Sequence, residues 1–379
     1  MLSLKFKKQW GEMNRLFEPG NIGSMTLKNR MVRSATWEGM CDPEGRPTKK
    51  LIQYYDNLAK GGIGLIISGY TYVSLEGKQN PGKMGLYSDD FKSEFKEMTR
   101  VVHDAGCKIA VQLVHAGGQA KAKFAGSTPV APSDIRVAQY SEKPLQLTES
   151  QIHDIVEAFG KAALRAKEYG FDGVQIHGAH GYLINQFLSP LTNHRQDQYG
   201  GSIENRCRFL MEVYDEIRQM VGKDFTVFIK LNAADYLEQG LELEDALIAA
   251  KMLSQKGIDA IEVSAGTGAS KKKSPIRIKI DQPEKEAYNL KVSLAVKNVV
   301  SCPVISVGGF RSYKVSRQTL EKHGLDFISF SRPLIREPDL PLRWQKGDIE
   351  PAACISCNAC FKPAYFKGGI YCVAKEKEK

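Results

Sequence analysis

Hydrophobic positions along the chain form eight short runs rich in apolar and β-branched residues, separated by longer stretches with helical periodicity. Runs that are mostly apolar, instead of alternating with polar residues, predict strands covered on both faces, as in a parallel sheet. The eight runs are Arg30–Ser34, Gly64–Ser68, Ile109–Leu113, Gly173–His177, Thr226–Leu231, Ala260–Val263, Val304–Val307 and Phe327–Phe330.

The stretches between these runs predict helices. In Ser150–Tyr169 the apolar side chains fall on one face at helical spacing. Thr148, followed three residues later by Gln151, predicts a capping box at the start of this helix. Three further segments share the periodicity, namely Ile203–Val221, Glu242–Lys256 and Ala287–Val299.

Eight strands alternating with about eight helices predict an α/β protein built as a single (β/α)8 barrel. An open, doubly wound sheet is the alternative, but no G-x-G-x-x-G motif follows the first strand. The length of 379 residues allows two or three domains of about 150 residues each. The strand count favours one barrel over residues 1–345, followed by a cysteine-rich tail over residues 346–379.

The composition, 42% hydrophobic and 25% charged, is that of an ordinary globular protein. The formal net charge is +10, but no basic stripe is interleaved with aromatic residues, so nucleic acid is not an expected partner. The stretch MLSLKFKKQW lacks the apolar region of a signal peptide, and no apolar run is long enough to span a bilayer. We therefore expect a cytoplasmic protein with a small-molecule substrate and no membrane partner, and a homo-oligomer is compatible with the sequence.

The active site of a (β/α)8 barrel lies at the carboxyl ends of its strands. The residues at those ends supply hydroxyl and amide groups, one cation near the centre, two imidazoles and a phenol. They include Ser34, Ala35, Thr36, Trp37, Tyr70, Gln112, His177, His180, Tyr182, Lys230, Ser264, Gly308, Gly309, Ser331 and Arg332. The loops after strands seven and eight commonly bind phosphate, and glycine backbone amides with an arginine suit that ligand.

Two histidines three residues apart, His177 and His180, follow the fourth strand. No Asp or Glu stands beside them to complete a metal-ligand set, and a purely structural role for one of them is another alternative. We expect both imidazoles to donate hydrogen bonds to an oxygen that develops negative charge. Tyr182 would then deliver a proton to carbon, the alternative being an ordinary buried aromatic residue.

The segment HGAHGYLINQFLSPLTNHRQDQYGGSIENR, which begins at His177, closely resembles the signature of the old yellow enzyme family of FMN-dependent oxidoreductases. Further motifs resemble the same family in the expected order between residues 16 and 344. They are LFEPGNIGSMTLKNRMVRSAT, KGGIGLII, QLVHAGGQ, VISVGGFRS and SFSRPLIREPDLP.

In this family FMN accepts a hydride from NADH or NADPH and passes it from N5 to the β-carbon of an activated alkene. The resemblance implies that His177 and His180 bind the carbonyl group of the substrate and that Tyr182 protonates its α-carbon. It also implies an FMN-binding set: Ser34, Ala35, Thr36, Trp37 and Tyr70 at the ring system, Gln112 and Lys230 at its pyrimidine side, and Gly308, Gly309, Ser331 and Arg332 at the phosphate.

Three residues depart from the family pattern. Lys230 stands where arginine is usual, which keeps the positive charge but loses the fork geometry of a guanidinium. Trp37 replaces a smaller residue near the flavin carbonyl and is expected to restrict substrates. Gln175 replaces a common glutamate, so a negative charge is missing from that strand.

The tail carries the pattern Cys354-x2-Cys357-x2-Cys360-x11-Cys372. Three thiolates at short spacing and one remote thiolate suit a [4Fe–4S] cluster. A structural zinc ion is the main alternative, and a tail without metal is a third. The stretch CISCNAC resembles the cluster segment of larger family members, trimethylamine dehydrogenase and 2,4-dienoyl-CoA reductase, although the latter usually has one more residue between the second and third ligands.

The leading functional hypothesis is an NAD(P)H-dependent reductase of α,β-unsaturated carbonyl or enoyl-type substrates. The second is an amine or other dehydrogenase that passes electrons through an iron–sulfur cluster to an electron-transfer partner, for which Trp37 and Tyr70 would offer aromatic faces to a cationic amine. The third is a non-catalytic flavin electron-transfer module, against which the intact His177, His180 and Tyr182 argue. The insertion Gly266–Pro283, which carries the lysine triplet Lys271–Lys273, is expected to form a solvated loop or a lid that steers phosphorylated or CoA substrates.

Overall fold

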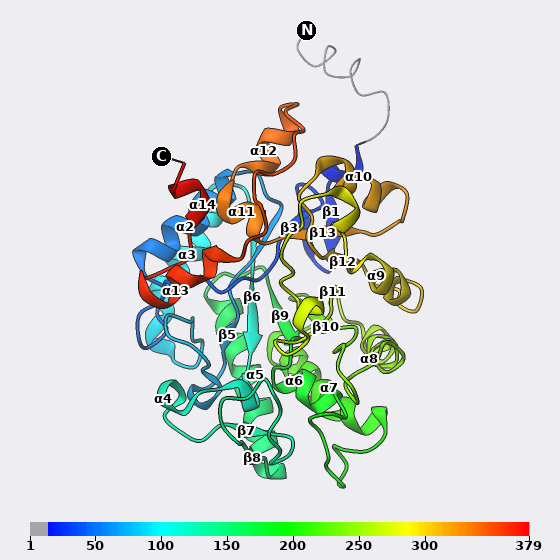
Figure 1. Cartoon of the computed structure of the whole chain (residues 1–379). Helices are drawn as coiled ribbons and strands as arrows, with labels where there is room; N and C mark the ends of the chain where they lie inside the picture. The colour runs from blue at the N-terminus through cyan, green and yellow to red at the C-terminus, as the bar shows by residue number, and fades with distance from the viewer. Residues whose placement is uncertain (1–13, 379) are drawn as a thin grey trace.

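The computed structural model describes residues 14–378, so the stretch MLSLKFKKQW lies outside the described residues. Within this range a barrel of parallel strands is surrounded by helices (Figure 1). The C-terminal segment, residues 346–378, packs on one side of the barrel next to α2 (Lys49–Lys60). There the Lys50 ammonium donates a hydrogen bond to the carbonyl of Gly368.

Eight strands form the barrel, and all eight were predicted from the apolar runs. They are β3 (Met31–Arg33), β4 (Leu65–Ile67), β6 (Lys108–Val114), β9 (Gly173–Gly178), β10 (Thr226–Asn232), β11 (Ile261–Ser264), β12 (Val304–Val307) and β13 (Phe327–Phe330). Each strand pairs in parallel with the next along the chain, and the last pairs with the first through the register Ile328↔Met31. The alternative of an open sheet is therefore wrong, because the sheet closes on itself.

Helices cover the outside of the barrel. The outer set is α2, α3 (Lys92–Asp104), α5 (Glu149–Glu168), α7 (Ile203–Val221), α8 (Leu243–Lys256), α9 (Leu290–Lys297), α10 (Tyr313–Glu321), α11 (Arg332–Arg336) and α12 (Leu340–Gln345). The bounds of α7 are those predicted, whereas α9 begins three residues later than expected. Ala287 has a φ of +49°, and a residue in this left-handed region cannot belong to a right-handed helix.

A hairpin that the sequence patterns did not indicate closes the amino-terminal end of the barrel. Its strands β1 (Gly20–Ile22) and β2 (Met25–Leu27) pair antiparallel. Their buried side chains join an apolar cluster with interior residues such as Phe228. The hydroxyl of Thr226, at the start of β10, donates to the carbonyl of Ile22 at 3.2 Å, which fixes the hairpin to this end.

Side chains along the strands alternate between the barrel interior and the helical layer. In β9, Val174 and Ile176 belong to the apolar cluster shared with the outer helices, while Gln175 between them bonds to other interior side chains. In β10, Phe228 is part of the interior apolar cluster and Lys230 follows two residues later on the same face. The interior thus changes from apolar to polar toward the carboxyl ends of the strands.

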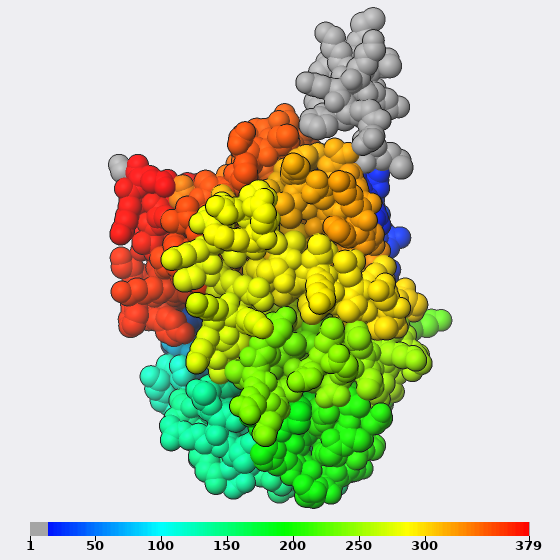
Figure 2. Space-filling model, turned by 45° about the vertical axis from the view of Figure 1, so that its right-hand side comes forward, coloured from blue at the N-terminus to red at the C-terminus, as the bar shows by residue number. Residues whose placement is uncertain are grey.

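Two segments meet above this polar end. The loop after β11 includes the predicted insertion Gly266–Pro283, and it lies beside the C-terminal segment, where Asn358 donates a hydrogen bond to the carbonyl of Ile276 at 2.9 Å. Figure 2 shows the loop in yellow on the surface next to the C-terminal segment in red. The division of the chain at residue 346 stays a prediction.

The remaining short elements are β5 (Thr71–Tyr72), β7 (Val130–Ala131), β8 (Leu145–Gln146), α4 (Ala122–Ala125), α6 (Leu183–Leu188), α13 (Lys362–Phe366) and α14 (Val373–Glu376). Across residues 14–378, every helix is too short or too polar to cross a lipid bilayer.

The capping box predicted from the sequence is present at the start of α5 and gives a stability test. The Thr148 hydroxyl accepts from the Gln151 N–H at 3.2 Å, and the Gln151 side chain accepts from the Thr148 N–H at 2.9 Å. Thr148→Ala removes one of these bonds, so we expect the free energy of unfolding to fall by about 1 kcal/mol. Denaturant unfolding followed by circular dichroism measures the change. Thr148→Ser keeps the hydroxyl and should unfold like the unmodified chain; equal losses in both variants would contradict the assignment.

Candidate active site

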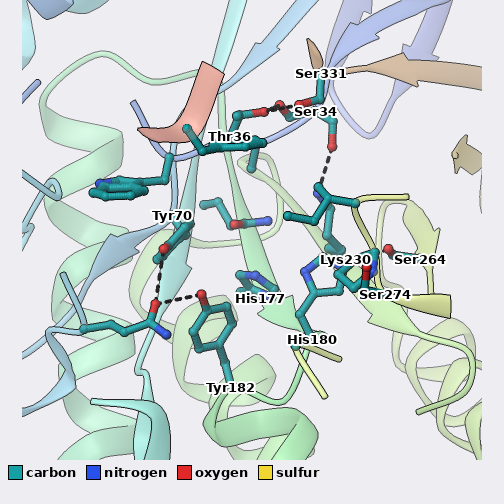
Figure 3. Close-up of a pocket in the computed structure, with 18 of the residues that line it drawn as sticks. Ser34, Thr36, Tyr70, His177, His180, Tyr182, Lys230, Ser264, Ser274 and Ser331 are labelled. Atoms are coloured by element: carbon teal, nitrogen blue, oxygen red, sulfur yellow. Dashed lines mark hydrogen bonds between the residues drawn. The ribbon is translucent and has the colours of Figure 1, made fainter. Parts of the chain in front are cut away.

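A cavity of ≈ 580 Å³ opens at the carboxyl ends of the barrel strands, where the sequence predicted the site (Figure 3). Most of the predicted residues line it: Ser34, Ala35, Thr36, Trp37, Tyr70, Gln112, His177, His180, Tyr182, Lys230, Ser264 and Ser331. Small-molecule sites typically have volumes of about 300–1,000 Å³. The structure therefore brings residues from seven barrel strands and their following loops into one site of suitable size.

His177 and His180 lie next to each other, with ring centroids 5.2 Å apart. Burial lowers the pKa of His177 well below 6.5, helped by the nearby His180, Lys230 and Lys83. Burial, together with Lys230, lowers the pKa of His180 to about 3. Both rings are therefore neutral at neutral pH, and each has one N–H to donate.

Neighbouring groups determine which nitrogen of each ring is available. The N–H of Ala179 donates to His177 Nδ1 at 3.3 Å, so the proton of the neutral ring is on Nε2. His180 Nε2 lies 2.8 Å from the Ser264 hydroxyl, which leaves Nδ1 for a ligand. His180 also has a φ of +62°, a strained backbone conformation for a residue with a side chain.

Tyr182 stands beside the imidazoles, its ring centroid 4.8 Å from that of His177. Its hydroxyl donates to Gln79 Oε1 at 2.9 Å, and the Tyr70 hydroxyl donates to the same oxygen at 3.2 Å. Figure 3 shows the hydroxyls of Tyr70 and Tyr182 converging on this amide. Burial raises the pKa of Tyr182, so the group is a protonated phenol at neutral pH.

Gln79 and Lys83 are site residues that the sequence analysis missed. Lys83 is 1% exposed; its ammonium donates to Gln79 Oε1 at 3.1 Å and lies 3.4 Å from the centre of the Tyr70 ring. Burial lowers the pKa of Lys83 well below 10.5. Both residues belong to a Gly- and Pro-containing loop without a recognisable motif, in which a lysine would ordinarily be exposed.

Hydroxyl groups and one cation occupy the other end of the cavity. The Thr36 and Ser331 hydroxyls are 2.7 Å apart, and the Lys230 ammonium donates to the Ser34 hydroxyl at 2.8 Å. Burial lowers the pKa of Lys230, and the carboxylate of Glu262, 3.3 Å away, acts against this shift. Figure 3 shows this group on the side of the cavity away from Tyr182.

The residues present fit FMN. Gln112 donates from Nε2 to Gln175 Oε1 at 2.7 Å, which leaves its own Oε1 as an acceptor in a residue that lines the cavity. The pyrimidine edge of a flavin carries an N–H between two carbonyl groups, so an acceptor together with the Lys230 cation matches its donor and acceptor pattern. The hydroxyls of Ser34 and Thr36 add further hydrogen-bonding groups.

Three predicted phosphate-binding residues, Gly308, Gly309 and Arg332, do not line this cavity. Gly309 has a φ of +75°, and a Cβ there would lie 2.8 Å from the Tyr288 ring, so only glycine fits. Arg332 Nη1 donates to Asn358 Oδ1 at 2.6 Å and to the carbonyl of Arg277 at 2.7 Å. Their role in binding phosphate stays a prediction.

The C-terminal segment contributes to the site, which the sequence analysis also missed. Asn358, Phe361 and Tyr365 line the cavity. Tyr365 packs edge-on against Trp37, with ring centroids 4.6 Å apart. The only signal in the sequence was the presence of aromatic residues directly after the third cysteine of the tail. It was missed because the tail was predicted to be separate from the barrel.

The four tail cysteines surround a second, much smaller cavity of ≈ 20 Å³ together with Arg332. Among residues 14–378, no three His, Cys, Asp or Glu side chains are arranged to hold a single metal ion. Cys354, Cys357, Cys360 and Cys372 thus lie around one small cavity, and their binding of a metal or a cluster stays a prediction.

Comparisons with known proteins identify the family of this chain. The NADH:flavin oxidoreductase / NADH oxidase family matches residues 15–350. The chain is 37% identical to the NADH oxidase of Thermoanaerobacter brockii over 348 residues, which cover 90% of the chain and 52% of that relative. It therefore spans about half the length of this relative.

Solved structures show the same fold. The structure of 2-naphthoyl-CoA reductase with 2-naphthoyl-CoA aligns with a TM-score of 0.86 and 28% identity, covering 94% of this chain and 56% of that one. The old yellow enzyme homologue from Zymomonas mobilis aligns with a TM-score of 0.77 and 31% identity, covering 92% and 98%. With the family match over most of the barrel, these findings show that the chain belongs to the NADH:flavin oxidoreductase / NADH oxidase family, the old yellow enzyme family.

Proposed function

We propose that the protein reduces the C=C bond of α,β-unsaturated carbonyl or enoyl-type substrates. The observation that carries this proposal is the placement of two neutral imidazoles and a protonated phenol on one wall of the cavity. Hydrogen-bond donors for a carbonyl oxygen and an acid for the neighbouring carbon are the two protein groups that such a reduction needs.

FMN, when bound, supplies the hydride chemistry, accepting a hydride from NAD(P)H and delivering one to the alkene. In the proposal Ser34, Thr36, Gln112 and Lys230 hold the ring system. The positive charge of Lys230 favours the electron-rich, reduced form of the cofactor at its pyrimidine side.

His177 and His180 would bind the substrate carbonyl oxygen. Because both rings are neutral, they donate hydrogen bonds without protonating the oxygen, and they stabilise the negative charge that builds up when the alkene is reduced. The bond between His180 and Ser264 and the bond between Ala179 and His177 keep the rings in place for this task.

Tyr182 would donate its proton to the α-carbon. Gln79 accepts the phenol hydrogen bond and so orients the hydroxyl before the reaction. The Lys83 side-chain nitrogen lies 5.5 Å from the centre of the Tyr182 ring, and in its protonated form it would stabilise the phenolate left after proton donation. A protonated Lys83 would thus make the weakly acidic hydroxyl of Tyr182 a better proton donor in this buried site.

We also infer that Cys354, Cys357, Cys360 and Cys372 hold a [4Fe–4S] cluster. All four cysteines line one small cavity, so they can supply the ligand set, and three closely spaced cysteines followed by a remote one are typical of such a cluster. Zinc, the alternative, would draw four sulfur ligands to about 2.3 Å from one ion. Such a cluster supports the alternative function, a dehydrogenase that passes electrons to a partner.

The role of Tyr182 gives the first test. We expect Tyr182→Phe to slow the reduction of an enone by about 100-fold or more, because a general acid contributes about 10²–10⁴-fold. The FMN content should stay within about twofold of that of the unmodified enzyme. The same holds for the rate of NAD(P)H consumption with an electron acceptor that needs no proton from Tyr182. Stopped-flow reoxidation of the reduced enzyme by 2-cyclohexenone measures the effect. Tyr140→Phe, a buried tyrosine outside the cavity lining, is the matched control; equal rates in both variants would remove Tyr182 from the mechanism.

The two imidazoles are tested by ligand binding. A phenol ionised in the site places its oxygen where the substrate carbonyl would lie, and each lost hydrogen bond to this charged oxygen weakens binding by about 1.5–3 kcal/mol, or about 10–100-fold. We expect this loss for His177→Ala and for His180→Ala in titrations followed by the long-wavelength absorbance of the bound phenol. His153→Ala, on the exposed face of α5, should bind like the unmodified enzyme. Unchanged binding in both cavity variants would contradict the donor role.

The cysteine cluster is tested by metal analysis. Protein purified without oxygen should contain about four iron atoms and about four acid-labile sulfides per chain. Cys357→Ala should lower both, while Cys302→Ala, a buried cysteine outside the tail, should lower neither. Zinc without sulfide, or no metal at all, would show that the cluster assignment is wrong.

A further inference from the structure

Glu262 is a fully buried carboxylate that the proposed reaction does not use. It lies on β11 in the barrel interior, is 0% exposed and does not line the catalytic cavity. Polar side chains of other strands surround its carboxylate and form hydrogen bonds or an ion pair with it. The contacts of Oε1 are the hydroxyls of Ser34 and Ser329, each at 2.7 Å, and those of Oε2 are Gln175 Nε2 at 2.7 Å and Lys230 Nζ at 3.3 Å.

Three of these contacts lead to the cavity wall, because Ser34 and Lys230 line it and Gln175 bonds to a residue that does. Lys230 lines the cavity and bonds to Glu262 both directly and through the Ser34 hydroxyl, which accepts from Lys230 and donates to Glu262. Gln175 accepts from Gln112 at 2.7 Å, and Gln112 also lines the cavity. One carboxylate therefore holds both the cation and the amide that face a bound flavin.

The charge of Glu262 also compensates for the missing charge at Gln175. The sequence analysis expected a loss of negative charge on β9, where glutamine replaces a common glutamate. In the structure the carboxylate is on β11 and lies within hydrogen-bond distance of that glutamine. The interior therefore contains one carboxylate next to the site cation, although glutamine stands at position 175.

Lys230 depends on this carboxylate. The other charged group acting on it is Arg33 of β3, which is itself buried and paired with Glu38, and the neighbouring His177 and His180 are neutral. Without Glu262, the ammonium would be a buried cation close to a second cation with no adjacent counter-charge, which is strongly unfavourable.

We propose that Glu262 is the positioning residue of the flavin site: it keeps Lys230 charged and holds Lys230 and Gln112 against the cavity. It acts through these residues and does not touch the cofactor. The inference rests on the proposed role of Lys230 and Gln112 at FMN, and the experiment separates the two.

The experiment measures FMN binding and the midpoint potential of the bound flavin between pH 6 and pH 9 in the purified enzyme. In E262Q, we expect FMN to bind at least about tenfold more weakly, since an isosteric amide loses the charge-assisted bonds. Loss of the counter-charge lowers the Lys230 pKa further, so the lysine loses its proton within this range as pH rises. The potential of E262Q relative to the unmodified enzyme should therefore become more negative with increasing pH, by about 30 mV for each tenfold loss in preference for reduced FMN.

Three further variants make the result decisive. The exchange E262Q/Q175E returns a carboxylate to the same network from β9 and should restore both FMN affinity and the pH profile of the potential. Ser329→Ala removes a Glu262 contact that does not lead to the cavity, and it should leave FMN binding unchanged within about twofold. Lys230→Met tests the flavin assignment itself and should shift the potential at all pH values.

The outcomes are distinct. If K230M shifts the potential but E262Q differs from the unmodified enzyme by a constant amount at every pH, Glu262 is only structural and the inference is overturned. If K230M leaves both the potential and FMN affinity unchanged, the proposed flavin site is wrong. If E262Q does not fold, the E262Q/Q175E exchange decides: a folded exchange variant with the original pH profile supports the inference, and one with a changed profile overturns it.

Discussion

The need to neutralise one buried charge organises the upper half of the barrel. The carboxylate of Glu262 is out of contact with water, and a buried charge is tolerated only when it is paired and hydrogen-bonded. Its partners come from the ends of four other strands, so the same bonds that neutralise it also fix those strand ends relative to one another. Lys230 is the partner with functional consequence, because it carries the compensating positive charge to the cavity surface. A requirement of the core and a requirement of the site are met by the same contact.

The two ends of the barrel interior differ: one end is an apolar core, and the other end leads into the cavity. At the amino-terminal end the interior is filled with apolar side chains and covered by the β1–β2 hairpin, where removal of large groups would create cavities in a packed core. Toward the carboxyl end the inward positions become polar and lead into a cavity of ≈ 580 Å³. Tyr182 and the two histidines lie on one side of this cavity and the hydroxyls of Thr36 and Ser331 on the other, which would let a substrate and a flavin each meet the side chains proposed for them.

The parts of this structure that follow local rules could be predicted from the sequence. Apolar runs located all eight barrel strands. Helical periodicity located α5 and α7, and a capping box marked the start of α5. The sequence also indicated His177 and Tyr182 as site residues, because they share one segment at the carboxyl end of a strand. It did not indicate Glu262 and Lys83, since each is an ionisable residue whose burial depends on partners that are distant in the sequence. Periodicity records which face of an element is apolar, but it does not record which buried charge another strand will neutralise.

The position of the C-terminal segment could not be predicted from local sequence patterns either. This segment contains the four clustered cysteines and also forms one wall of the cavity. Cys360 lies in the turn Ala359–Phe361, whose last residue lines the cavity, and Tyr365 in the next helix packs against Trp37. Arg332, directly after β13, bonds to Asn358 between the second and third cysteines and so ties the turn to the barrel. Closely packed side chains transmit displacements instead of absorbing them. A group bound by the four cysteines, as proposed above, would therefore be coupled through this packing to the aromatic wall of the cavity.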